Sequence, residues 1–331
     1  MAIVNYFLAE PALDNIIGKL IQLLYEGIGN FGWTVVIFTV ILRTVLLPVD
    51  IWQKRVMIKN NRIMKKIKPQ LEKLQKQYAG NREMYGAKQM ELYKKEGYSL
   101  FGACLPMIVT LAVFWIVFSG FYATVRYRNE MITYELAELY NEGARDEELA
   151  DAYGENIESW LWIKNVYMPD TMWADIVPSK KVYTGSKLGQ LRAQMPENFN
   201  EMGDYNTLVG PAIEKYNKKD WKDTGGWNGY MILPLLAVLL NFATTILMKN
   251  SQPVQPAPMG ADGNPMNNQS MKMMQYMMPF LIGVFSLFYS SAFTIYLFFS
   301  ALYSGIFNLI FNKINAKAEQ KLESAASSYR R

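Results

Sequence analysis

The chain has 331 residues, of which 51% are hydrophobic and 14% aromatic, and its formal net charge is +5. The apolar residues are gathered in long blocks, as in proteins that cross a membrane several times, which excludes an ordinary soluble enzyme. Histidine, the commonest general base and metal ligand, does not occur, and a single cysteine, Cys104, excludes a disulfide framework. We therefore expect no catalytic residue, no metal site and no cofactor.

Residues 1 to 30 predict an amphipathic helix that lies at the membrane surface. Between Leu13 and Ile28 the apolar residues recur at helical spacing, while Lys19 and Glu26 interrupt them. The start of the chain has no basic region and no small-residue cleavage pattern, so we expect no cleaved signal peptide.

The first predicted span covers residues 31 to 53 and carries Arg43 within its apolar run. About 20 apolar residues suffice to cross a bilayer, and a guanidinium near the centre of such a helix costs about 2.5 to 3.5 kcal/mol. A functional role would explain why the chain has Arg43 at this position despite the cost. The alternative is an arginine that extends to the nearer interface, since Asp50 lies about 10 Å further along the helix. Pro48 is expected to end or kink this span.

Residues 54 to 98 predict a basic helical hairpin. The segment holds thirteen lysines and arginines against four glutamates, a net charge of +9 in 45 residues. Apolar residues persist at three and four spacing, and Ala-Gly-Asn at 79 to 81 supplies a turn between two amphipathic helices. A solvated run of charge is the alternative, which this periodicity disfavours. Because basic loops stay in the cytoplasm, we expect the hairpin there and the N-terminus outside.

The second span is expected over residues 99 to 125. A polar segment follows from 126 to 228, with twelve basic and eighteen acidic residues, and its net charge of −6 agrees with an extracytoplasmic location. Within it, 130 to 158 predicts acidic helix and 159 to 173 an aromatic segment at the membrane surface. Residues 174 to 226 carry no pattern that indicates a structure or a function.

Three further spans complete the predicted topology. One covers residues 229 to 249, a Pro/Gly/Asn-rich cytoplasmic loop covers 250 to 270, and two more spans share 271 to 312. Residues 313 to 331 form a basic cytoplasmic tail with a net charge of +3. The predicted fold class is an all-α polytopic membrane protein with five transmembrane helices, its N-terminus outside and its C-terminus in the cytoplasm.

Several hydroxyl and amide side chains fall at membrane depth together with Arg43, whereas no aspartate or glutamate lies deep in a span. An arginine without an acidic partner in the membrane is best hydrated, which predicts a hydrophilic groove open to one side. The residues expected to line it are Arg43, Thr39, Asn241, Gln275, Thr294 and Ser300. For each serine or threonine singly, the alternative is a hydroxyl bonded to its own helix or to a neighbouring one.

A cluster of methionines, MKMMQYMM at residues 271 to 278, opens the fourth span. Flexible, polarisable side chains suit a surface that accepts many apolar partners, although a single methionine more often fills a gap in a core. The residues expected to form this apolar surface are Met273, Met274, Met277, Met278 and Phe298.

Three stretches make the chain resemble the YidC family of membrane protein insertases. They are GNFGWTVVIFTVILRTVLLP at 29 to 48, the lysine-rich block that ends in a G-x-C-x-P pattern around Cys104, and MMQYMMPF with the last span. The resemblance covers residues 29 to 123, 159 to 170 and 229 to 312.

The resemblance implies a five-helix core around a hydrophilic groove that is open to the cytoplasm. It implies that Arg43 and Thr39 are groove residues and that Tyr296 is the tyrosine of the last span. The implied function is that of a membrane protein insertase and chaperone in the cytoplasmic membrane, similar to those of Gram-positive bacteria. Arg43 would hold a polar or acidic segment while an apolar segment slides past the methionine surface into lipid. Expected partners are nascent membrane proteins, the lipid bilayer, the ribosome, the Sec translocon and targeting factors, without a specific nucleic-acid sequence.

The chain departs from the family pattern in accessory parts. Ser290, Ser291 and Ala292 stand where the family has Pro-Ser-Gly, and the segment 126 to 228 is much longer than the usual loop. Two functions from other classes stay open. One is a scaffold that assembles membrane proteins without inserting them. The other is a small transporter, which should show inverted repeats, and the sequence contains no convincing internal repeat.

Overall fold

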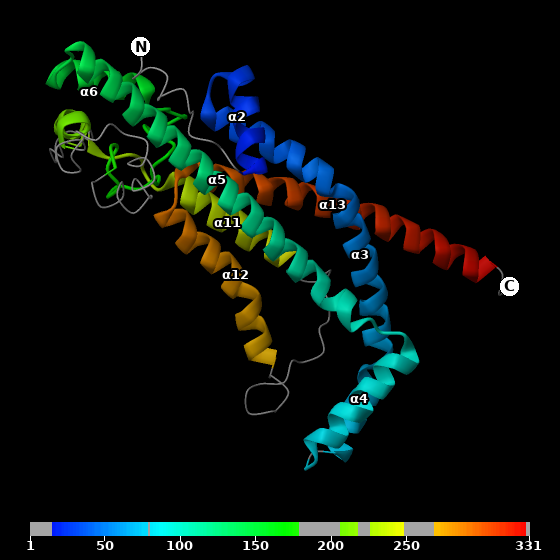
Figure 1. Ribbon diagram of the computed structural model, residues 1–331. Helices are drawn as coiled ribbons and strands as arrows, with labels where there is room; N and C mark the ends of the chain where they lie inside the picture. Colours follow the sequence, from blue (N-terminus) through cyan, green and yellow to red (C-terminus); the bar gives the residue numbers. More distant parts are fainter. Residues whose placement is uncertain (1–14, 79, 179–205, 218–225, 248–267, 329–331) are drawn as a thin grey trace. The chain divides into compact units, whose positions relative to one another are not determined.

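The computed structural model describes residues 15–78, 80–178, 206–217, 226–247 and 268–328 (Figure 1). Over these ranges the regular secondary structure is helical, and the one extended pairing is an isolated antiparallel bridge between Trp160 and Ile163. The helices are α2 (Ile16–Ile28), α3 (Phe31–Gln77), α4 (Arg82–Glu96), α5 (Leu100–Glu142), α6 (Asp146–Asn156), α10 (Gly210–Tyr216), α11 (Ile232–Leu247), α12 (Asn268–Phe288) and α13 (Ser291–Ser328). Residues 1–14, most of 179–225 and the loop 250–267 lie outside the described ranges.

Three helices of the described part are long and apolar enough to cross a membrane. They are Phe31–Gln77, Ile108–Glu142 and Ser291–Ala318. Two shorter apolar helices, Ile232–Ile246 and Pro279–Phe288, have between 10 and 17 residues. The second of these is the end of α12, which has 21 residues in all and would rise about 31 Å, close to the roughly 30 Å of a hydrocarbon core. The prediction of an all-α membrane protein is confirmed, and the count of five spans stays a prediction.

Two helices continue past the boundaries expected from hydropathy. α3 does not end at Pro48, and it also contains Pro69. α5 runs on to Glu142, well beyond residue 125. A proline removes one backbone hydrogen bond, which a helix with intact turns on both sides tolerates. The change from apolar to charged residues therefore marks a change of surroundings along one helix.

The chain divides into two compact units. Unit 1 comprises Met1–Val40, Trp115–Val238 and Ile282–Phe299. Unit 2 comprises Ile41–Phe114, Leu239–Leu281 and Ser300–Arg331. The helices α3, α5, α11, α12 and α13 each contribute a segment to both units.

Unit 1 has a hydrophobic core where the end of α5 meets α6 and α10. Leu136 of α5, Tyr153 of α6 and Ala212 of α10 are at most 1% exposed. The acidic helix expected over 130 to 158 is divided here, because Gly143 takes a φ of 112° and ends α5. Part of the long polar segment is thus a compact helical cluster.

An irregular segment of unit 1, residues 157 to 178, is anchored by buried polar side chains. Asn228 accepts from the backbone amide of Asn165 at 2.8 Å and donates to the Asn165 carbonyl at 2.9 Å. Asp170 is fully buried and accepts from the backbone amide of Leu233, in the first turn of α11, at 2.8 Å. These bonds satisfy backbone groups that a buried loop would otherwise leave unpaired.

The aromatic residues of this segment pack against the first turns of α3. The ring centroids of Phe31 and Tyr167 are 5.2 Å apart, and those of Trp33 and Trp160 are 5.7 Å apart. A Cβ at Gly32 would lie 2.2 Å from the Trp160 ring, so glycine is required for this approach. Trp160 and Tyr167 therefore belong to the core of unit 1, and the expected location at the membrane surface stays a prediction.

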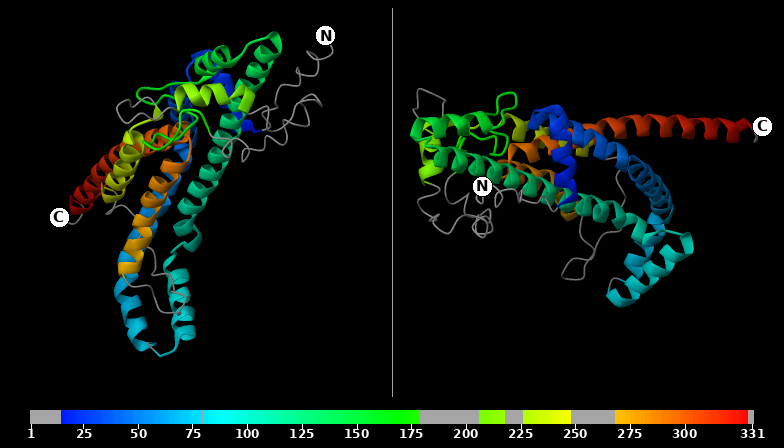
Figure 2. Two further views of the ribbon diagram at one scale, coloured as in Figure 1. Left: turned by 90° about the vertical axis from the view of Figure 1, so that its left-hand side faces the viewer. Right: turned by 45° about the horizontal axis from the view of Figure 1, so that its top comes forward.

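Unit 2 contains a helical hairpin formed by the second part of α3 and by α4 (Figure 2). Ile67 of α3 is fully buried and packs with Tyr93 and Tyr98. Lys66 Nζ lies 2.6 Å from Glu96 Oε2 across the two helices. Apolar residues at helical spacing thus pair the two helices while their lysines remain at the surface.

Replacing Tyr98 by phenylalanine is expected to stabilise the hairpin by about 1 kcal/mol, because it removes an unpaired buried polar group. Tyr98 is 6% exposed, and its hydroxyl has no hydrogen-bond partner in the part of the chain that the structure describes. Burial raises the pKa of Tyr98 to about 12. The unfolded value is about 10, so this residue's contribution to stability is complete below pH 10 and is lost as the pH rises through 12.

Thermal unfolding followed by circular dichroism at pH 8 and pH 11 measures both effects. The increase in unfolding temperature caused by Tyr98→Phe should be larger at pH 11 than at pH 8. The Tyr78→Phe variant serves as the control. A gain that does not change with pH would contradict the role assigned to Tyr98.

Candidate functional site

Arg43 of α3 and Ser300 of α13, both predicted groove residues, are in direct contact in unit 2. Arg43 Nε donates to Ser300 Oγ at 2.8 Å, and Nη2 of the same guanidinium donates to the same oxygen. Arg43 is half-buried and Ser300 is 4% exposed. Near them the hydroxyls of Thr44 and Tyr303 lie 3.3 Å apart. A guanidinium has five N–H donors, so three remain for another acceptor after these two bonds.

Asn241 lies on the part of α11 that belongs to unit 2 and is half-buried. Its backbone carbonyl accepts from the hydroxyls of Thr244 and Thr245, at 2.9 and 2.8 Å. These two threonines therefore bond to their own helix. A cavity of about 130 Å³ lies between α11 and α13, with Leu240 and Leu302 among its mostly apolar lining. An apolar cavity of this size accepts methyl groups more readily than water.

Two predicted groove hydroxyls, Thr39 and Thr294, belong to unit 1 and are fully buried. Thr39 Oγ1 donates to the Val35 carbonyl at 2.6 Å. Thr294 Oγ1 donates to the Ser290 carbonyl at 3.4 Å. Thr39 thus bonds within α3, whereas Thr294 bonds to the carbonyls of Ser290, before α13, and of Ser286 in α12. Their place in a groove stays a prediction.

The two aromatic site residues of α13 also belong to unit 1. Tyr296 is 3% exposed, and its ring stacks on Phe293 with the centroids 5.9 Å apart. Phe298 is half-buried and meets Phe299 edge to face at 5.2 Å. These rings contribute to packing in unit 1.

The remaining predicted residues lie on α12. Met277 is 51% exposed, and its neighbour along the helix, Phe280, is 63% exposed. The side chains of four predicted residues lie outside the described part, namely Met273, Met274, Gln275 and Met278. The exposed part of α12 in unit 2 thus presents large apolar side chains.

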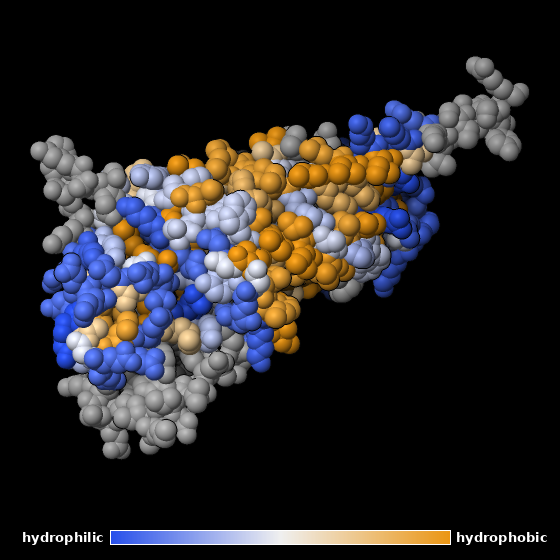
Figure 3. Space-filling model, turned by 90° about the horizontal axis from the view of Figure 1, so that it is seen from above, coloured by the Kyte–Doolittle hydropathy of each residue, from blue (hydrophilic) through white to orange (hydrophobic). Residues whose placement is uncertain are grey.

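Further large apolar side chains are exposed on other helices. Val45 of α3, Leu239 of α11 and Leu309 of α13 are 69%, 63% and 55% exposed. Figure 3 shows apolar residues gathered in broad orange areas, apart from the hydrophilic ones. Exposed apolar surface on this scale marks contact with lipid or with another chain.

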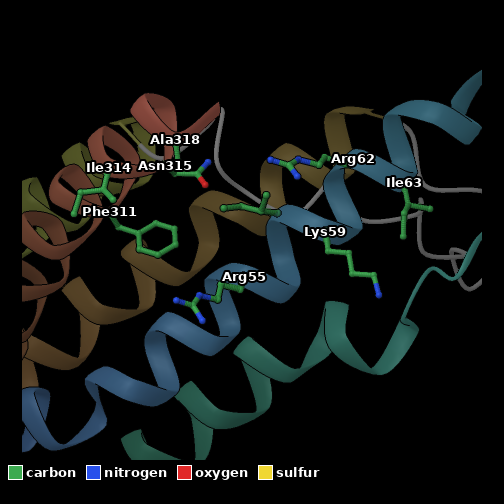
Figure 4. A pocket seen from close by; sticks show the side chains of 9 residues that line it. Arg55, Lys59, Arg62, Ile63, Phe311, Ile314, Asn315 and Ala318 are labelled. Carbon is green, nitrogen blue, oxygen red and sulfur yellow. The ribbon is translucent and has the colours of Figure 1, made fainter. Parts of the chain in front are cut away.

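A larger cavity of about 470 Å³ lies between α3 and α13 in unit 2 (Figure 4). Its lining includes Arg55 and Arg62 of α3 and Phe311 and Ile314 of α13. In the sequence, these arginines stand out only as part of the hairpin charge. Their spacing of seven residues, two helical turns, places both on one face of α3 and was the available signal.

The site residues offer hydrogen-bond donors and apolar contacts. Ser300 accepts from Arg43, and a guanidinium cannot serve as a general base. Within the ranges that the structure describes, no group of three or more His, Cys, Asp or Glu side chains could hold a metal ion. The arrangement suits binding and orientation of a polar group beside an apolar surface.

The chain is similar to known membrane proteins. The model of the family described as "60Kd inner membrane protein" matches residues 23–319. Three curated relatives are each named "Membrane protein insertase YidC". The protein of Leptospira interrogans serovar Lai is 26% identical over 185 residues, which are 56% of this chain and 24% of the relative. That of Caldanaerobacter subterraneus is 35% identical over 103 residues, 31% of this chain and 48% of the relative.

The third relative, from Helicobacter pylori, is 32% identical over 110 residues, 33% of this chain and 19% of the relative. The matched parts therefore span less than half the length of each of these relatives. The family model, by contrast, matches most of this chain, and the helices that it covers include the three candidate spans. The chain thus belongs to the 60Kd inner membrane protein family, the YidC/Oxa1 family.

Proposed function

We propose that the protein inserts newly made proteins into the cell membrane and helps them to fold there. The observation that carries the proposal is the half-buried Arg43 guanidinium, bonded to Ser300 at 2.8 Å with donors to spare. Family membership and the relatives named as insertases support it. The proposed function requires no chemical reaction and no cofactor.

In this proposal Arg43 lowers the cost of bringing a polar segment into the membrane. An unpaired polar group in hydrocarbon costs several kcal/mol, and an isolated charge costs far more. A carboxylate of the incoming segment would accept two N–H bonds from the guanidinium, and water in a groove would hydrate the rest. The groove is proposed to be open to the cytoplasm and lined by Arg43, Asn241, Gln275 and Ser300 of unit 2, whereas the buried Thr39, Thr294 and Tyr296 pack within unit 1.

The apolar segment of the substrate is proposed to pass along an apolar slide into lipid. Transfer of apolar surface out of water contributes about 25 cal/mol per Å². The exposed Met277 side chain supports a slide on α12. The full set of proposed slide residues is Met273, Met274, Met277, Met278 and Phe298.

We further propose five spans in the cytoplasmic membrane, with the N-terminus outside and the C-terminus in the cytoplasm. The hairpin over residues 54 to 98, with its net charge of +9, would then face anionic lipid and the ribosome. Nascent membrane proteins, targeting factors and the Sec translocon are the proposed protein partners. The segment 126 to 228 would lie outside the cell.

The Arg43→Ala substitution is expected to lower insertion of a substrate with an acidic translocated tail about tenfold. A hydrogen bond to a charged group contributes about 1.5 to 3 kcal/mol, and 1.4 kcal/mol corresponds to a factor of ten. The measurement is insertion of a short single-span protein into liposomes that contain the purified chain, scored by protease protection. Substrates with acidic and with neutral tails are compared in parallel.

Two variants control for folding and charge. Ser304→Ala removes a hydroxyl one turn from Ser300 on the same helix and should leave insertion unchanged. Arg43→Lys keeps the charge and should retain much of the activity on acidic tails. Equal losses for acidic and neutral tails would reject the charge role of Arg43. Insertion no better than with empty liposomes would reject the insertase and favour a scaffold or a small transporter.

A further inference from the structure

A tight turn in the irregular segment of unit 1 exposes a large apolar side chain. Trp160 and Ile163 close the turn through two backbone hydrogen bonds, each of 2.9 Å. Between them Leu161 takes a φ of 52°, a left-handed conformation that glycine and asparagine adopt with less strain. The Leu161 side chain is 64% exposed. Leucine here strains the backbone and packs little within the protein, which points to a contact outside the chain.

The strained turn is fixed to the rest of unit 1 by the buried Asp170. Trp162, the residue after Leu161, donates from Nε1 to one carboxylate oxygen of Asp170 at 3.1 Å. The other oxygen accepts from the backbone amide of Tyr230 at 2.8 Å, and the next residue, Met231, has a φ of 61°. Leu161 and Met231 are the two non-glycine residues with positive φ in the described ranges. Because one carboxylate binds a neighbour of each, the turn has a defined place in the fold.

The turn lies at the level where three apolar helices begin. The carbonyl of Met168 accepts from the backbone amide of Ser291, the first residue of α13, at 2.9 Å. Trp160 packs against Trp33 in the first turn of α3, and Asp170 binds the first turn of α11. α3 and α13 include candidate spans, and α11 is a shorter apolar helix. Since the end of an apolar span lies at the boundary between membrane and water, these contacts indicate that the turn lies at that boundary.

The exposed surface near the turn continues the apolar surface of α3. Trp33, which contacts Trp160, is 49% exposed, and Ile37, one turn further along α3, is 41% exposed. In the irregular segment Met172 is 44% exposed. Tryptophan concentrates at the level of lipid head groups, and exposed leucines of interfacial segments enter the start of the acyl chains. Lipid is therefore the occupant that fits both the level and the composition of this surface.

We propose that the turn from Trp160 to Ile163 is a lipid contact, in which Leu161 enters the bilayer just below the head groups. The left-handed backbone would then be retained because it directs an apolar side chain away from unit 1 and into lipid. A protein that covers Leu161, including a second copy of this chain, is the alternative that the test must exclude. The proposal concerns contact with lipid and holds whether or not the protein is an insertase.

The test uses the full chain in phosphatidylcholine liposomes, with Cys104→Ser so that one introduced cysteine carries a nitroxide label. Electron paramagnetic resonance measures how often the label collides with oxygen, which concentrates in lipid, and with a water-soluble nickel chelate. For Leu161→Cys the balance should shift toward oxygen, as for Ile37→Cys. The exposed Glu155→Cys on α6 is the aqueous control. A label at 161 that collides mainly with the nickel chelate, or with neither reagent because protein covers it, would overturn the proposal.

Two substitutions of Leu161 separate its apolar side chain from its backbone strain, with the label placed at Met172→Cys. Leu161→Asn suits the left-handed conformation but removes the apolar side chain, so it should shift the label at 172 toward the nickel chelate. Leu161→Met retains both the strain and an apolar side chain, so it should leave the label unchanged. Circular dichroism checks that each variant keeps the helix content of the original. Equal responses to the two substitutions would overturn the proposal, since the apolar side chain would then not determine the depth of the segment.

Discussion

Replacement of Asp170 by alanine is expected to lower the free energy of unfolding by about 3 to 5 kcal/mol, because three donors lose their acceptor. The fully buried carboxylate accepts from the backbone amides of Tyr230 and Leu233, each at 2.8 Å, and from Trp162 Nε1 at 3.1 Å. Its negative charge also lies at the N-terminus of α11, where it complements the helix dipole. Asp170 thus connects an irregular loop with the first turn of a helix.

Two further variants make this prediction specific. Asp170→Asn keeps one acceptor oxygen and should cost less than Asp170→Ala. Gly229→Ala should also destabilise the protein, because a Cβ there would lie 1.9 Å from the Asp170 carboxylate oxygen. Urea unfolding in detergent micelles, followed by tryptophan fluorescence, measures each loss. Glu155→Ala removes an exposed carboxylate from the same unit and should change stability by less than about 0.5 kcal/mol. A loss as small for Asp170→Ala would refute the anchoring role.

Replacement of Glu158 by alanine is expected to cost about 3 kcal/mol, the lower end of the range for a broken buried ion pair. Glu158 and Arg128 are only 14% and 17% exposed, with Oε1 and Nη2 3.9 Å apart. Glu158 also accepts from the Tyr25 hydroxyl of α2 and from the Phe31 amide of α3. Loss of Glu158 leaves the Arg128 guanidinium without this carboxylate and removes a link among α2, α3 and α5.

The same urea titration measures this loss, with Glu138→Ala on the exposed side of α5 as the control. A second readout comes from Tyr25, whose pKa is raised by burial and then by the hydrogen bond to Glu158. Ultraviolet absorbance should therefore detect ionisation of Tyr25 at a lower pH in the Glu158→Ala variant. An unchanged tyrosine titration together with unchanged stability would show that Glu158 does not hold this network.

The helical elements were predictable to the extent that they depend on local pattern. The apolar blocks and the three-and-four spacing in the hairpin predicted helices that correspond to α3, α4 and α13. Helix ends were less predictable, because hydropathy reports the surroundings of a helix and not its hydrogen bonds. α3 and α5 accordingly run through the boundaries expected at residues 53 and 125. The turn at Gly143, inside a region expected to be one acidic helix, depends on a single backbone conformation.

The candidate site also has features that local sequence pattern predicts and features that it does not. Arg43 could be singled out because a cation in an apolar run costs free energy wherever the chain folds. The bond from Arg43 to Ser300 joins residues that are 257 positions apart, so no local pattern predicts it. Thr39 and Thr294 could only be named as hydroxyls, and their bonds to nearby carbonyls decide what they contact. Arg55 and Arg62 were visible as charges, whereas their shared cavity requires α13.

The sequence by itself determined that this protein is a helical membrane protein with one arginine in its first span and a strongly basic hairpin. Composition and short-range periodicity suffice for these features, because they follow from the transfer of side chains between water and lipid and from the 3.6-residue helical repeat. Only the tertiary structure decided that Ser300 accepts hydrogen bonds from Arg43, that Asp170 anchors the start of α11, and that a cationic cavity forms between α3 and α13. These depend on packing between segments far apart in the chain, where side-chain shape and hydrogen-bond geometry select the partners.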